Sequence, residues 1–488
     1  MSDTADRIVR NSAFNLTGQG VYAVFHLLSI VVMARALGAA VFGQYYIIFS
    51  LTLAAQVIAE AGGTILTRRL VREPADQRRI ISEGAAIFVV VGAVSAALLV
   101  AAGYGFAWWR GDSILVRAFM AAAVACAAIQ VQRFCAGVLQ GSELFGYENG
   151  ARVLQGAVFA GLVLLWVSAG GRNLFEVVSI FAVSHLAAAV FLLSLLQRHH
   201  RLLWPSRRIA WRSWLSEAGP LGSGDVIRGL TWQLDTVLLG FLQPAAVVGI
   251  YSIAYRPLGP LNWLPRAVLA ASFPSFTRLA NDPAALEQAF AKSIRVLTIL
   301  SVPIATTIFV FAEPIVLLVA GTEYLEAAIP LRILIWVAVL SFFTMHFRYV
   351  MAAIGKQRAY AWLVGGVFAF ELTAELALIP RWGYLGACAG TLAGEVIFAA
   401  AGLALCRRAG ISALPWSLLA RAAVAGMAIV PLLWLVREAP LLALVAAAAT
   451  AIGLYFALCV WLGAVERQEV RQFRGALLRL LRPAARAV

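Results

Sequence analysis

Charged residues are scarce in this chain, and their scarcity excludes an ordinary soluble protein. Only 13% of the 488 residues are Asp, Glu, Lys or Arg, whereas 62% are hydrophobic and the mean hydropathy is +0.85. A typical soluble domain has about 25% charged residues. A chain this apolar needs lipid as its solvent, so we expect an integral membrane protein of the all-α class.

Motifs for catalysis and for cofactor binding are missing too. No GxxxxGK[ST] loop is present, which excludes a built-in P-loop ATPase. The sequence has no cluster of residues with metal-ligand spacing and no plausible Ser/His/Asp arrangement. We therefore predict that the chain is not an enzyme, holds no metal and uses no cofactor.

Cysteine pairs and a cleavable leader are also missing. The five cysteines lie in or beside apolar stretches without a CxxC pair: Cys126, Cys135, Cys388, Cys406 and Cys459. We expect them to be small buried side chains, not a disulfide or metal framework. The first apolar stretch is long enough to span and lacks an A-x-A-like cleavage site, so no signal peptide is expected.

Long apolar stretches are what the sequence has in abundance. A membrane helix needs about 20 mainly apolar residues. Fourteen stretches meet this length, at 12–34, 41–61, 84–105, 114–136, 150–169, 174–196, 218–240, 246–270, 290–311, 330–354, 359–379, 384–406, 415–436 and 441–463. The sequence therefore predicts 14 transmembrane helices.

Basic residues alternate between the two predicted sides of the membrane. With a cytoplasmic N-terminus, the inner segments hold 23 of the 39 Lys and Arg residues and the outer segments hold 5. The positive-inside rule then predicts both termini in the cytoplasm, as in a multi-pass protein of a bacterial inner membrane. The net charge of +15 points to anionic membrane lipids, not nucleic acid. The longest outer loop, 312–329, is expected to hold at most one small helix.

One motif occurs twice. Residues 245–251 (AAVVGIY) match residues 39–45 (AAVFGQY) at an offset of 206, and 347–360 weakly resembles 134–147. We predict two parallel six-helix lobes around a central cavity, at 1–196 and 218–406, followed by two extra C-terminal helices within 407–463. A cytoplasmic linker at 197–217 and a basic tail at 464–488 are expected to lie on anionic lipid as amphipathic helices, or simply to set the topology.

Polar residues inside two predicted spans outline a candidate substrate site. Asp225, Arg228 and Asp235 share one face of the span at 218–240. The next span carries Tyr255, Arg256 and Arg266, and its prolines Pro257, Pro260 and Pro265 should bend it. Guanidinium groups suit phosphate oxygens, so these arginines are candidates for binding an anionic substrate. A structural salt bridge of Arg228 with Asp225 or Asp235 is the alternative.

Other spans carry further polar candidates. The first span has a stripe containing Asn15, Tyr22 and His26, which either lines the cavity or holds helices together. Glu371, Glu375 and Glu395 lie within the eleventh and twelfth spans. Such acids are candidates for coupling transport to an ion or proton, or for pairing with the arginines.

Three segments resemble one known family. MARALGAAVFGQYYIIFSL (33–51), LDTVLLGFLQPAAVVGIYSIAYRP (234–257) and RWGYLGACAGTLAGE (381–395) are similar to helix junctions of the polysaccharide and O-antigen flippases. That family lies within the multidrug/oligosaccharidyl-lipid/polysaccharide exporter superfamily. The resemblance implies a transporter that moves a polyprenyl-diphosphate-linked oligosaccharide to the outer leaflet by alternating access, for polysaccharide or lipopolysaccharide synthesis. Related lipid II flippases have an arginine on helix 1, and its absence here argues against lipid II as cargo.

Three other functions stay open. One is a cation-coupled multidrug exporter of the same superfamily, and another is a membrane enzyme that polymerises or ligates glycans. The third is a non-transporting scaffold for a synthesis complex. Short outer loops disfavour the enzyme. If the chain is a flippase, a polysaccharide polymerase and glycosyltransferases are the expected partners, along with the lipid-linked oligosaccharide itself.

Overall fold

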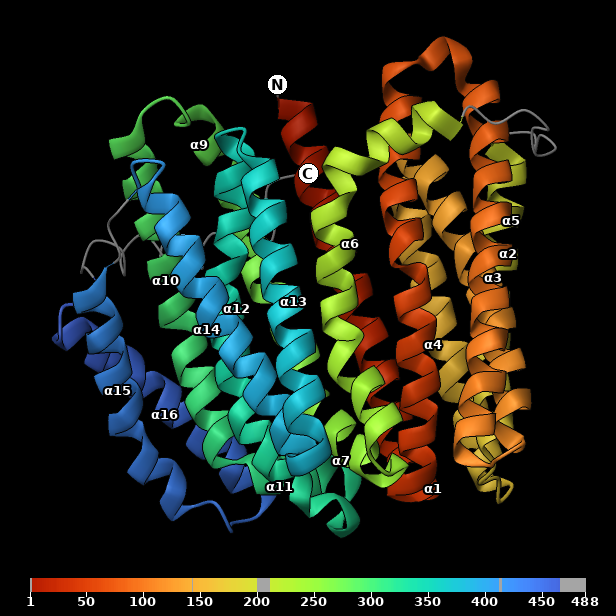
Figure 1. Cartoon of the computed structure of the whole chain (residues 1–488). Coiled ribbons are helices and arrows are strands. Elements are labelled where there is room, and N and C mark those ends of the chain that lie inside the picture. The colour runs from red at the N-terminus through yellow and green to blue at the C-terminus, as the bar shows by residue number, and fades with distance from the viewer. Residues whose placement is uncertain (1, 143, 200–210, 412–414, 466–488) are drawn as a thin grey trace, which may run out of the picture. The chain divides into compact units, whose positions relative to one another are not determined.

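A computed structural model describes residues 2–142, 144–199, 211–411 and 415–465, which form helices without any strand (Figure 1). Most of the predicted linker and tail, at 200–210 and 466–488, lies outside these residues. The helices are α1 (Ser2–Arg72), η1 (Pro74–Asp76), α2 (Gln77–Arg110), α3 (Ile114–Gly141), α4 (Phe145–Ser168), α5 (Leu174–His199), α6 (Trp211–Leu242), α7 (Ala245–Tyr255), α8 (Leu258–Leu261), α9 (Trp263–Arg278), α10 (Pro283–Val310), α11 (Ala312–Ala320), η2 (Thr322–Ala327), α12 (Ala328–Ala353), α13 (Gln357–Trp382), α14 (Tyr384–Arg407), α15 (Trp416–Leu435) and α16 (Leu441–Trp461).

The all-α membrane class is confirmed. Within the described residues, eleven helices are long and apolar enough to cross a membrane. Helix α1 counts once among them although Gly38, with φ of 71°, interrupts its helical backbone between two predicted spans. Helices α6 to α9, which carry the seventh and eighth predicted spans, are not among the eleven. The number fourteen and the arrangement in lobes therefore stay predictions.

The chain divides into two compact units, which we describe separately. Unit 1 comprises residues 1–256, 319–330 and 357–394, and unit 2 comprises 257–318, 331–356 and 395–488. In unit 1, α1 packs against α3, α4, α6 and α7, while α3 also packs against α2 and α5, and α6 against α13. In unit 2, α10 packs against α9, α15 and α16.

The prolines after α7 divide the predicted span into shorter helices, although Arg256, Pro257 and Asn262 keep helical backbone angles. The predicted span at 246–270 is divided into α7, the four-residue α8 and α9. Pro257 immediately precedes α8, and Pro265 lies in the first turn of α9. Because proline has no N–H to donate, consecutive turns lose their backbone hydrogen bonds here.

Two loops are shorter than the sequence predicted. Helix α1 continues to Arg72, so the predicted cytoplasmic segment at 62–83 is mostly helical. The outer segment at 312–329 holds two helices, α11 and η2, instead of one. Apolar periodicity locates the part of a helix that lies in lipid, but helices extend beyond it wherever their backbone can continue.

The five cysteines are all buried and free, as predicted. Burial in apolar surroundings leaves them as small packing side chains. Large apolar residues such as Trp108, Trp362, Leu442 and Trp461 are exposed, at 84%, 83%, 85% and 80%. Exposure of this extent is the pattern expected for helices that face lipid.

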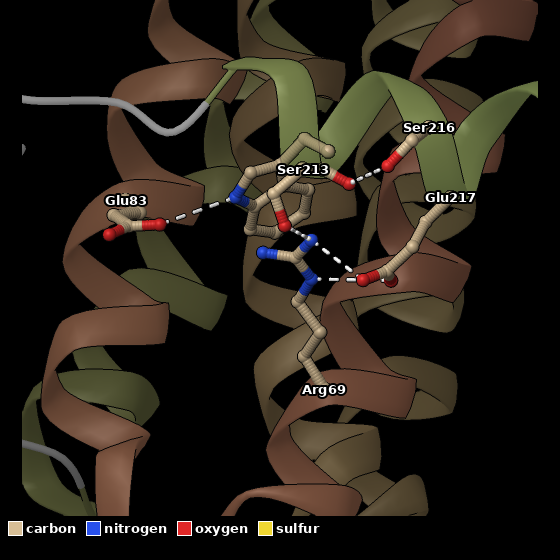
Figure 2. A network of polar contacts seen from close by, with 6 residues as sticks. Arg69, Glu83, Ser213, Ser216 and Glu217 are labelled. Carbon is tan, nitrogen blue, oxygen red and sulfur yellow. Dashed lines mark hydrogen bonds and ion pairs between the residues drawn. The ribbon is translucent and has the colours of Figure 1, made fainter.

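The start of α6 is anchored to α1 by Arg69 and to α2 by Trp214. Figure 2 shows Arg69 of α1 between Ser213 and Glu217, at the end of the predicted linker. Its Nη2 donates to Glu217 Oε1 at 2.8 Å and to Ser213 Oγ at 2.7 Å, and its Nε donates to Glu217 Oε2 at 3.2 Å. The guanidinium also lies 4.4 Å from the ring centroid of Trp214, whose indole N–H donates to Glu83 of α2.

The two copies of the repeated motif contact each other. A Cβ on Gly43 would overlap the carbonyl oxygen of Ala245, and a Cβ on Gly249 would overlap the carbonyl oxygen of Ala39. Each copy therefore places its glycine against the first alanine of the other. We call residues 39–45 copy 1 and residues 245–251 copy 2. Only glycine allows backbones this close.

Candidate functional site

Asp235 of α6 is the centre of a buried group of hydroxyls. Its side chain is 3% exposed, and its Oδ2 accepts hydrogen bonds from Tyr251 at 2.5 Å, Tyr255 at 2.9 Å and Thr391 at 3.4 Å. The donors come from α7 and α14. These three hydroxyls are side-chain donors to Asp235, and the pairing of Arg228 with Asp225 or Asp235 stays a prediction.

Two further acids lie beside this group. Glu375 and Glu371 of α13 are 1% and 3% exposed. Glu375 interacts with Asp235, Glu371 and Thr391. A Cβ on Gly390 would approach Glu375 Cγ to 2.6 Å, so α14 leaves room for this side chain by having glycine there. Three carboxyl groups thus share one buried region of unit 1, and a buried carboxylate needs a proton or a counter-charge.

Arg256, directly after α7, lies against α1. Its Cζ is 4.3 Å from the ring centroid of Tyr46, and its Nε donates to the Ser252 carbonyl at 3.0 Å. It forms no ion pair with a carboxylate among the described residues. A guanidinium over a tyrosine ring is stabilised by about 0.5–2 kcal/mol without losing its charge. The positive charge therefore stays available to an anion.

Two predicted residues of α1 lie near this arginine. His26 and Tyr22 are half-buried, their rings are 5.6 Å apart, and both lie within electrostatic range of Arg256. His26 Nδ1 is buried without a hydrogen-bond partner in the described part of the chain. The structure thus brings together Tyr22, His26 and Arg256, which the sequence assigned to different repeats.

The other predicted residues lie elsewhere along the helices. Arg228 lies half-buried on α6, two helical turns before Asp235. Asp225 and Asn15 lie on α6 and α1, but their side chains are outside the described ones. Arg266 of α9 is exposed in unit 2. Glu395, also in unit 2, accepts a hydrogen bond from Thr344 at 2.8 Å.

Several polar residues were not predicted as site residues. Thr391 and Tyr46 have no charge, and their roles appear only when distant helices pack together. His346 is fully buried in unit 2, where a ring nitrogen lies 2.9 Å from Ser293 Oγ. It stands inside an apolar run, and a histidine in a predicted span was the one signal that could have marked it.

The chain has similarity to known flippases and transporters. The family model described as polysaccharide biosynthesis protein matches residues 8–280, and the MatE model matches 231–372. A probable flippase, AglR of Haloferax volcanii, is 24% identical over 167 residues, which is 33% of this chain and 34% of AglR. That match therefore spans about a third of the curated relative.

Two solved structures extend this similarity to the fold. The lipid II flippase MurJ, in an inward closed conformation, has a TM-score of 0.75 at 12% identity, covering 91% of this chain and 98% of MurJ. An inward-facing multidrug resistance MATE family transporter has a TM-score of 0.66 at 13% identity, covering 81% and 98%. Because the first family model covers more than half of the residues, the chain belongs to the polysaccharide biosynthesis protein family.

Proposed function

We propose that this protein moves a polyprenyl-diphosphate-linked oligosaccharide from the cytoplasmic to the outer leaflet of a bacterial inner membrane. Alternating access of a central cavity carries the polar head through about 30 Å of hydrocarbon while the prenyl tail stays in lipid. Family membership and the likeness to MurJ support a flippase. The exported unit is a precursor of surface polysaccharide, and a polymerase and glycosyltransferases are the partners.

Arg256 is the observation that carries the proposal. Placing a guanidinium between the helices of a membrane protein costs free energy unless the group interacts with a negative charge. Here it contacts the face of Tyr46 instead of a carboxylate, although Asp235 lies on the same helical hairpin. Such an arrangement separates the positive charge from the acids. A diphosphate is a dianionic or more highly charged group whose oxygens match guanidinium donors, so it is the ligand that fits best.

Asp235, Glu375 and Glu371 are the proposed coupling residues. Their shared burial and the hydroxyls of Tyr251, Tyr255 and Thr391 suit a proton or a monovalent cation that enters and leaves as the protein changes conformation. Arg228 and Asp225, about two and three turns before Asp235 along α6, extend this polar face towards the substrate. Glu395 remains a proposed coupling residue and Arg266 a proposed substrate-binding residue, and both belong to unit 2.

Replacing Arg256 by glutamine tests the proposal. We expect R256Q to lower surface polysaccharide about tenfold at equal protein level, because a charge-assisted phosphate contact is lost. R256K should retain part of the activity, since lysine keeps the charge but not the two-pronged donor geometry. R278Q, which neutralises an exposed arginine on α9, is the matched control. Normal export by R256Q would refute a role of this cation in transport.

A cation-coupled multidrug exporter is the second candidate. The observation in its favour is that the MatE model matches residues 231–372, a segment that contains Asp235, Glu371 and Arg256. The test is accumulation of fluorescent organic cations in cells with and without the protein. Lower accumulation that depends on Asp235 but not on Arg256 would favour drug export. Export of polysaccharide that depends on Arg256 favours the flippase.

A further inference from the structure

Three arginines near the end of α1 have different surroundings. Arg69 is 9% exposed and is held by Glu217, Ser213 and the ring of Trp214 (Figure 2). Arg68 and Arg72 stand four residues apart and so share another face of the helix. Neither forms an ion pair among the described residues. The sequence RRLVR therefore contains one structural arginine and two with unused charge.

Arg68 and Arg72 line a cavity of about 450 Å³ between α1 and the end of α3. The other lining residues are Thr64, Thr67, Val71 and Gln140. None of the six is acidic. A cavity of this volume is within the usual range for small-ligand sites, about 300–1,000 Å³. The cavity is open to its surroundings and its accessible lining is mainly apolar, with Arg68 and Arg72 among the residues that line it.

The walls of this cavity are held rigidly. Thr67 Oγ1 donates to the carbonyls of Gly137 at 2.9 Å and Gly63 at 3.1 Å, which ties α1 to α3. Gln140 Nε2 donates to Glu148 Oε2 at 2.6 Å, and Glu148 is in turn neutralised by Arg152 at 2.8 Å. Glu148, which contacts Gln140, thus has its own cationic partner. Fixed walls reduce the entropic cost of holding a ligand.

We propose that this cavity, which we call the α1–α3 pocket, binds the phosphate group of a membrane lipid at the cytoplasmic interface. Guanidinium pairs bind phosphate oxygens with charge-assisted hydrogen bonds. The predicted topology places this end of α1 at the cytoplasmic surface, where anionic headgroups concentrate. The volume exceeds what a lone phosphate fills, and the apolar wall suits the start of a lipid tail.

Two kinds of lipid have a phosphate next to an apolar chain. One of them follows from the proposed function. If the protein is a flippase, the polyprenyl diphosphate carrier would meet this pocket before it enters the membrane interior. The other source is a resident phospholipid such as phosphatidylglycerol. Both present phosphate next to an apolar chain, so a direct comparison distinguishes them.

The experiment measures lipid binding to the purified full chain in phosphatidylcholine nanodiscs. Polyprenyl diphosphate and phosphatidylglycerol are titrated in separate series, and bound lipid is counted by native mass spectrometry. We expect R68Q/R72Q to weaken binding at least about tenfold, because two charge-assisted contacts are lost. R68K/R72K should lie between this variant and the wild type. Tighter binding of the diphosphate identifies the transported lipid, and equal binding identifies a resident phospholipid.

R78Q/R198Q is the matched control. It removes two exposed basic residues from predicted cytoplasmic ends without touching the α1–α3 pocket. If this variant weakens binding as much as R68Q/R72Q, general surface charge explains the result and the pocket is refuted. Full binding by a correctly folded R68Q/R72Q refutes it as well. The assay needs no transport, so a protein that binds lipid here but exports nothing would overturn the proposed function alone.

Discussion

Copy 1 and copy 2 have nearly the same sequence and contact each other reciprocally, yet their polar surroundings differ. In copy 2, Tyr251 donates to the buried Asp235. In copy 1, the equivalent Tyr45 has ring contacts with Phe49 and Phe181, and Ser29 stands where Asp235 does at the offset of 206. The backbone geometry of the repeat was kept after duplication, whereas the buried charge is found in one copy.

The two copies also begin differently. Copy 1 follows Gly38, whose φ of 71° interrupts α1, and the Ala39 N–H donates to Glu323 Oε1 at 2.7 Å. Copy 2 follows Pro244, and α7 has no side-chain cap. A carboxylate from a residue 284 positions away thus caps only the first copy. The two copies therefore share the geometry of their mutual contact, but the start of each copy is stabilised differently.

The largest effect is expected from breaking the contact between the copies. In G43A the new methyl group meets a backbone carbonyl that cannot rotate away, so we expect a loss of about 1–3 kcal/mol or more in stability and a loss of export. Thermal unfolding in detergent and surface polysaccharide are the measurements. G20A, on the same helix with nothing near its new Cβ, should be neutral or stabilising by up to about 1 kcal/mol. Equal unfolding temperatures for the two variants would contradict the contact.

A smaller effect is expected from removing one hydroxyl in each copy. Y251F takes a hydrogen bond away from a buried carboxyl, which typically costs about 1.5–3 kcal/mol when that group is charged. Y45F removes a hydroxyl that has no hydrogen bond among the described residues, so it should change stability by less than about 0.5 kcal/mol. Unfolding in detergent compares them directly. A cost for Y45F equal to that for Y251F would remove the proposed asymmetry.

The smallest effect is expected from the cap of copy 1. E323A should cost about 0.5–1 kcal/mol, because the Ala39 N–H then bonds to water instead. E326A removes an exposed acid from the same short helix and serves as the control. The readout is the difference in unfolding temperature at matched detergent concentration. An unchanged midpoint for E323A would mean that this end of the helix needs no cap.

Sequence alone predicted the membrane class, the repeat and the buried polar helix faces, because these features are local. Apolar stretches of about 20 residues mark spans regardless of what packs against them. The break after Tyr255 was also visible in three closely spaced prolines. The sequence did not show that the predicted span divides into three helices there, since a proline bends or ends a helix according to its surroundings.

The partners of the buried charges could not be predicted in the same way. Thr391 is 156 residues from Asp235, and Tyr46, the cation–π partner of Arg256, directly follows copy 1 and is far from Arg256 in the chain. Which of Glu371, Glu375 and Glu395 belong together depended on helix packing, which periodicity does not determine. The sequence therefore identified the charged residues but not their neighbours.

The reciprocal contact of Gly43 with Ala245 and of Gly249 with Ala39 has the form of an isologous interface, in which the same patch meets itself across a two-fold axis. Two separate chains of half this length could form that contact as a homodimer. Fusion into one chain freed each half from having to be identical to the other. An acid such as Asp235 could then arise on one side only, which a symmetric dimer would have been forced to carry twice.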